Sequence, residues 1–102
     1  MKRARLQPVI QLFVCTNSRD ASDPLCTGCG ASGPSVYQAL KREVAHEGRA
    51  GDVWVTRTLC LGQCPPTGCT VAIQPENTHW VGVTESDANT LLRHALSRTR
   101  GP

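Results

Sequence analysis

"VTRTLCLGQCPPTGCTVAIQPENTHWVGV", residues 55–83, carries three cysteines in a Gly- and Pro-rich loop between segments of strand character. These are Cys60, Cys64 and Cys69, and the first two have the spacing Cys-x3-Cys. After the loop, the apolar runs "TVAI" and "HWVGV" are joined by a Pro-Glu-Asn turn, which predicts an antiparallel hairpin. Several thiols close together in one loop indicate disulfides, metal binding or redox chemistry, and the rest of the sequence helps to choose among them.

The segments before this loop predict a strand, a helix and a second strand. Residues 8–14, "PVIQLFV", gather β-branched and aromatic residues in a short run, which is typical of a buried strand. Pro34 suits a first helical turn, and apolar residues at four-residue spacing after it predict a helix over 34–47. Residues 52–56, "DVWVT", alternate apolar and polar side chains and predict the second strand.

The last segment predicts a second helix and completes the fold. Thr84 precedes Asp87 by three residues, a capping-box pattern that opens a helix over 85–97. The element order is therefore β-α-β-β-β-α. A strand, crossover helix and strand imply a parallel pair, to which the hairpin adds antiparallel strands. We expect an α/β fold of the minimal thioredoxin-like kind, a mixed four-stranded sheet flanked by helices in two or three layers.

The length and the placement of charge limit the possible functions. The 102 residues suit one domain, which we place at 8–97 between a basic N-terminal tail (1–7) and a C-terminal tail (98–102). The formal net charge is +3, yet residues 8–96 hold six basic and eight acidic side chains, so the excess of positive charge belongs to the tails. This pattern argues against a nucleic-acid-binding surface. No apolar stretch approaches the length of a membrane helix, so we expect no membrane partner.

Six cysteines in so short a chain indicate disulfides, metal binding or redox chemistry. The basic start followed by an apolar run at 9–14 imitates a signal peptide, but the run is short and Gln11 interrupts it. We therefore expect a cytoplasmic, reducing location, where clustered cysteines more often bind metal than pair with each other.

The predicted topology brings several cysteines to one place. Cys15 ends the first strand, Cys26 and Cys29 precede the first helix, and Cys60 and Cys64 follow the second strand. Because parallel strands end at the same edge of a sheet, these thiols should converge there. Four thiolates around one point suit either zinc or an iron–sulfur cluster. The spacing departs from the paired Cys-x2-Cys units of zinc ribbons.

The stretches "VCTNSRD", "CGASG", "YQALKREV", "CLGQC" and "TVAIQPENTHWVGVTESDANTLLRHAL" resemble the thioredoxin-like 2Fe-2S ferredoxins, relatives of the Shethna protein and of the small iron–sulfur subunit of respiratory complex I. The resemblance covers about residues 9–96. It implies a one-electron carrier, not an enzyme, with a 2Fe-2S cluster held by Cys15, Cys29, Cys60 and Cys64. It also implies redox partner proteins and a possible homodimer.

Several alternatives accompany this reading. Cys26 forms a Cys-x2-Cys unit with Cys29, so either could be the second ligand, and the two could instead form a redox-active dithiol. Cys69 is an additional cysteine that we expect to be a small buried hydrophobe. Trp80 is expected in the core, with a dimer interface as its other possible role. Alternative functions are a redox-switched interaction or protective protein of the Shethna type, and a zinc-stabilised binding module.

Overall fold

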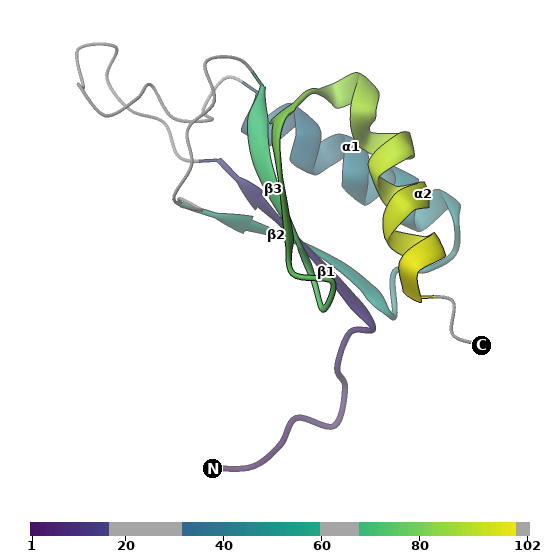
Figure 1. Ribbon diagram of the computed structural model, residues 1–102. Coiled ribbons are helices and arrows are strands. Elements are labelled where there is room, and N and C mark those ends of the chain that lie inside the picture. The colour runs from purple at the N-terminus through teal and green to yellow at the C-terminus, as the bar shows by residue number, and fades with distance from the viewer. Residues whose placement is uncertain (17–31, 60–67, 100–102) are drawn as a thin grey trace.

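The computed structural model describes residues 1–16, 32–59 and 68–99 (Figure 1). Its element order is β-α-β-β-β-α, as predicted, with a short 3-10 turn, Glu85–Asp87, before the last helix. The elements are β1 (Ile10–Cys15), α1 (Gly33–His46), β2 (Val53–Thr58), β3 (Cys69–Gln74), β4 (Thr78–Val83) and α2 (Ala88–Thr99).

In the described residues the strands form one mixed four-stranded sheet in the order β2-β1-β3-β4. β1 and β2 are parallel, with Ile10 opposite Val53 and Cys15 opposite Thr58. The pairs β1–β3 and β3–β4 are antiparallel. The parallel pair follows from the helical crossover between β1 and β2, because a tight turn can join only antiparallel strands. The mixed sheet is confirmed.

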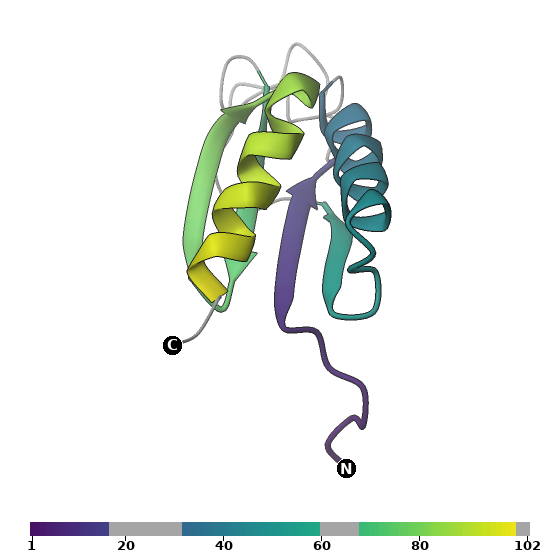
Figure 2. The ribbon, with the colours of Figure 1, turned by 90° about the vertical axis from the view of Figure 1, so that its right-hand side faces the viewer.

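Both helices cover the same face of the sheet, so the fold has two layers (Figures 1 and 2). In Figure 2, α1 lies toward the β2 side and α2 toward the β3–β4 side. On β1, Ile10, Leu12 and Val14 are buried, whereas Gln11 and Phe13 between them are only half-buried. The core includes alternate strand residues together with one stripe of each helix, among them Ile10, Leu12, Val14, Val36, Leu40, Val53, Val71, Ile73, Leu91 and Leu92.

The capping box predicted at Thr84 and Asp87 is present. The Asp87 carboxylate accepts hydrogen bonds from the Thr84 backbone N–H (2.9 Å) and hydroxyl (3.0 Å). The first turn after Thr84 is a 3-10 turn, and α2 itself begins at Ala88 and continues to Thr99. Tightened first turns of this kind are common where a helix starts.

The expectation that Trp80 belongs to the core is wrong. Trp80 is 39% exposed on the edge strand β4. Its indole N–H donates to the Thr78 hydroxyl (3.1 Å), and its ring meets that of His94 on α2 edge to face, at a centroid distance of 5.0 Å. An edge strand has no neighbour on its outer side, so a large ring there can lie along the rim of the helix layer and stay partly in solvent.

None of the helices among the described residues has the length and apolar character needed to span a membrane. The N-terminal residues before β1 extend away from the sheet, at the end opposite to the one where β1 terminates (Figure 1). The candidate site lies at that other end.

Candidate metal centre

Cys15 is the last residue of the central strand β1, at the end of the sheet where the parallel strands β1 and β2 terminate. It is 1% exposed, and its Sγ donates a hydrogen bond to the carbonyl oxygen of Leu59 at 3.6 Å. Leu59 directly precedes Cys60 in the chain. The parallel register of β1 and β2 thus brings the first predicted thiol next to the segment that carries the third and fourth.

Hydrogen bonds hold the ends of β1 and β2 together beyond the regular ladder. The backbone N–H and the hydroxyl of Thr16 both donate to the carbonyl oxygen of Thr58, at 2.9 and 3.2 Å. The Thr58 hydroxyl donates back to the carbonyl oxygen of Val14 at 3.4 Å. Each such bond contributes about 1 kcal/mol net. The two strands therefore stay paired up to the point where the thiol-bearing segments begin.

The first residue of α1 packs against the backbone of Cys15. A Cβ added at Gly33 would lie 2.3 Å from the carbonyl oxygen of Cys15 and 2.8 Å from the Cα of Thr16. Only glycine lets the start of α1 approach the end of β1 this closely, which brings the segment after Cys29 to the same edge.

A second close backbone contact, between Gly68 and Gly82, lies where the chain re-enters the sheet. A Cβ on Gly68 would lie 2.4 Å from the carbonyl carbon of Gly82 on β4. Both glycines have a positive φ, +74° and +70°, a conformation that other residues rarely adopt. Gly68 is the first described residue after Cys64, so both ends of this Cys-bearing segment, Leu59 and Gly68, are fixed to the sheet.

Of the predicted ligands, only Cys15 lies among the residues that the structure describes. Cys15 is at the predicted strand end and buried, whereas Cys26, Cys29, Cys60 and Cys64 lie outside the described residues. Cys69 opens β3, is fully buried and belongs to the core, as expected for a small hydrophobe. Residues 1–16, 32–59 and 68–99 contain no cluster of three or more His, Cys, Asp or Glu side chains able to hold a metal ion.

The described residues with shifted pKa values are Arg49, Asp52 and Asp87, and none of them belongs to the candidate site. A side-chain hydrogen bond from Arg49 lowers the pKa of Asp52, and the same contact raises the pKa of Arg49. The backbone N–H and hydroxyl of Thr84 lower the pKa of Asp87. The Asp52 carboxylate pairs with Arg49 in the turn before β2, and the Asp87 carboxylate caps the start of the last helix, as the sequence predicted.

The donor set at the sheet edge suits a soft metal centre. One buried thiol and the flanks of two other cysteine-bearing segments meet there, and thiolates are the ligands preferred by zinc and by iron–sulfur clusters. The described residues thus supply one buried thiol of the kind that such a group requires, and the other predicted thiols lie outside them. Sequence reasoning placed Cys15 at the end of the first strand, but it missed the contact of Gly33 with Cys15, which only the packing of α1 on β1 reveals.

Comparisons with known proteins agree with this architecture. No protein-family model matches the chain, and no curated protein matches it significantly. Among solved structures, the chain is similar to the thioredoxin-like [2Fe-2S] ferredoxin from Aquifex aeolicus. The wild-type protein matches with a TM-score of 0.77 and 21% identity over 88% of this chain and 87% of that one. A second structure of that ferredoxin matches with a TM-score of 0.78 and 20% identity, covering 92% and 86%. At this identity the likeness establishes the fold.

Proposed function

We propose that this chain is a small one-electron carrier that holds a 2Fe-2S cluster on Cys15, Cys29, Cys60 and Cys64 and catalyses no reaction of its own. The observation that carries the proposal is the meeting of Cys15, Gly33 and Leu59 at one edge of the sheet. A fold shared with a [2Fe-2S] ferredoxin supports it.

The cluster, when bound, supplies reversible uptake of one electron. The chain supplies the ligands and their surroundings. Cys15 is buried at the end of a central strand, so its sulfur is shielded from water and held at a fixed position relative to the sheet. Burial and hydrogen bonding around ligand sulfurs are the means by which a protein adjusts a reduction potential.

Cys29 is the second ligand in this proposal, and Cys26 is not. The glycine contact at the start of α1 supports this choice, because Gly33 follows Cys29 by four residues and is pressed against Cys15. Cys29 is nearer than Cys26 along the chain to this anchored point. The reducing cytoplasm is the proposed location, since thiolate ligands must stay reduced to bind.

A pair of matched variants tests the proposal. Cys15→Ala removes a proposed ligand, whereas Cys69→Ala removes another fully buried cysteine at a strand end. Cys15→Ala should lose the iron and acid-labile sulfide or change the visible spectrum strongly. Cys69→Ala should keep both and lose only about 1 kcal/mol of stability. Equal metal content in the two variants would contradict the role given to Cys15.

A further inference from the structure

In the described part of the folded body, the carboxylates have partners close to them. Three of them pair with arginines, one contacts a histidine ring, and Glu43 and Asp87 accept hydrogen bonds from uncharged groups. The pairs are Glu47–Arg93 (2.6 Å), Asp52–Arg49 (2.9 Å), Glu85–Arg42 (3.9 Å), Glu76–His94 (2.9 Å), Glu43–Asn89 (2.7 Å) and Asp87–Thr84 (2.9 Å).

Two cations of the same region are arranged differently. Among residues 8–16, 32–59 and 68–97, Lys41 and Arg57 form no ion pair with a carboxylate. Both instead lie against the ring of Tyr37, with the Lys41 Nζ 5.8 Å and the Arg57 Cζ 5.2 Å from its centroid. A cation–π contact holds a charge in place without neutralising it. Two exposed positive charges, one on α1 and one on β2, therefore lie against the same aromatic ring.

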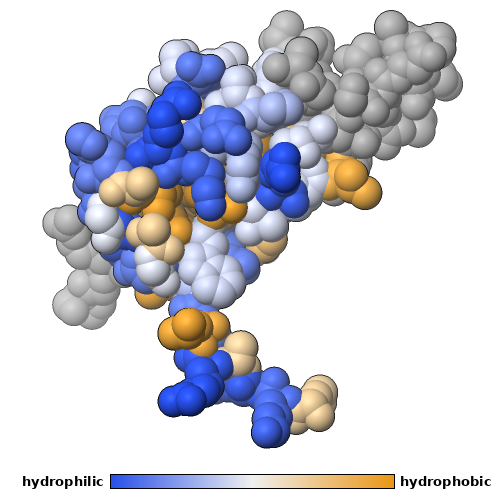
Figure 3. Space-filling view, turned by 180° about the vertical axis from the view of Figure 1, so that it is seen from behind, coloured by the Kyte–Doolittle hydropathy of each residue, from blue (hydrophilic) through white to orange (hydrophobic). Residues whose placement is uncertain are grey.

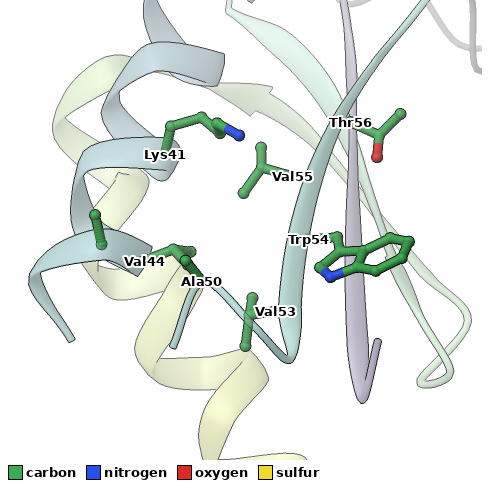
Figure 4. A pocket seen from close by; sticks show the side chains of 8 residues that line it. Lys41, Val44, Ala50, Val53, Trp54, Val55 and Thr56 are labelled. Atoms are coloured by element: carbon green, nitrogen blue, oxygen red, sulfur yellow. The ribbon is translucent and has the colours of Figure 1, made fainter. Parts of the chain in front are cut away.

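An apolar groove that Lys41 helps to line lies along β2, an edge strand of the described sheet. Its volume is about 490 Å³, and it is lined by Lys41, Val44, Ala45, Ala50, Val53, Trp54, Val55 and Thr56. In Figure 4, Lys41 extends from α1 toward Val55, while Trp54 and Thr56 lie on the other side of the strand. Figure 3 shows this face of the molecule, with apolar atoms in the middle and hydrophilic side chains around them. Trp54 is 38% exposed.

The same surface continues to the edge where the thiols are expected. Arg57 is opposite Val14 in the parallel register, one position before Cys15 and Thr58. Leu59 follows and is 79% exposed, although its carbonyl oxygen accepts the hydrogen bond from Cys15. An exposed leucine beside a buried ligand gives a partner an apolar contact very near the centre.

We propose that this α1–β2 surface, defined by Tyr37, Lys41, Trp54, Arg57 and Leu59, docks an acidic one-electron carrier protein. The inference rests on the proposed function and adds the class of partner and the place of contact. Carboxylates of the partner pair with Lys41 and Arg57, while Trp54 and Leu59 supply apolar contact. One electron crosses the contact, so one protein is oxidised as the other is reduced, and no covalent bond changes.

The test uses an acidic flavodoxin as the probe and the full-length protein labelled for amide NMR. The docking variant is Lys41→Glu/Arg57→Glu, and the matched control is Lys2→Glu/Arg3→Glu in the N-terminal segment. Both variants lower the formal net charge from +3 to −1, so they differ only in where the charge is changed. Titrations are made at about 0.01 M and about 0.15 M salt, where screening lengths are about 30 and 8 Å.

Flavodoxin should shift the amides of residues 37–45 and 53–59 at low salt and much less at the higher salt. The docking variant should bind about tenfold more weakly or worse, and the control should stay within about threefold of the wild type. Equal weakening in both variants, shifts confined to α2 and β4, or no binding at all would overturn the proposal. Shifts of the same residues by a single-stranded oligonucleotide, but not by flavodoxin, would also overturn it. The visible spectrum of each sample reports separately on the cluster.

Discussion

Replacing Gly33 by alanine would separate the start of α1 from the end of β1. The added Cβ would lie 2.3 Å from the carbonyl oxygen of Cys15, whereas ordinary contacts begin at 3.4 Å. Both neighbouring groups are backbone, so no side chain can rotate away. The helix must therefore move by about 1 Å relative to the strand that carries the first proposed ligand.

The expected cost follows from the packing of this contact. Overpacking a closely packed site costs about 1–3 kcal/mol. For a domain of this size that corresponds to a fall in melting temperature of about 4–20 °C. The movement also displaces the segment after Cys29 from Cys15, so Gly33→Ala should lose its visible absorption faster than the wild type when exposed to a chelator.

Thermal unfolding and the rate of bleaching check this prediction, with Gly51→Ala as the control. A Cβ at Gly51 meets no atom within 4 Å. The free energy of unfolding of Gly51→Ala should therefore lie within about 1 kcal/mol of the wild-type value, and its visible absorption should bleach at the wild-type rate. If Gly33→Ala melts and bleaches like the wild type, the contact between α1 and Cys15 does not position the site, and the reasoning fails.

Three further predictions concern the second ligand, the helix cap and the oligomeric state. Cys29→Ser should change the visible spectrum strongly and Cys26→Ser should leave it nearly intact; the reverse result would exchange their roles. Asp87→Asn should lower the melting temperature near neutral pH, because Thr84 lowers the pKa of Asp87 and the carboxylate form is favoured by folding. This difference should vanish as the pH falls below the ordinary value of 3.8, and a difference that persists in acid would refute the cap. The exposed edge strand carrying Trp80 predicts a homodimer, so light scattering should give twice 11.0 kDa, and a monomer mass would count against it.

The element order and the sheet could be predicted because the local signals agree with the global fold. The alternation of Val53 with Trp54 and Val55 indicated a strand with one buried face, and Val53 and Val55 are buried while Trp54 is partly exposed. Thr84 and Asp87 marked the start of the last helix to within one turn. Such patterns depend on near neighbours in the chain, which the sequence displays directly.

Contacts between distant segments were harder to predict. The placement of both helices on one face, the exposure of Trp80 and the contacts of Lys41 and Arg57 with the Tyr37 ring all depend on how the helices and strands pack together. The contact of Gly33 with Cys15 has the same origin. The parallel pairing of β1 and β2 could be predicted, and it brings Cys15 next to Leu59, the residue before Cys60. The other three cysteines of the predicted site, and the alternative ligand Cys26, lie outside the described residues, so their arrangement stays a prediction.

The absorption spectrum of the purified protein before and after dithionite, with iron and sulfide analysis of the same sample, tests the central claim most directly. A 2Fe-2S cluster on four thiolates should give visible absorption that partly bleaches on reduction, with two iron and two acid-labile sulfides per chain. A colourless protein, isolated without oxygen and holding stoichiometric zinc in place of iron, would contradict the claim.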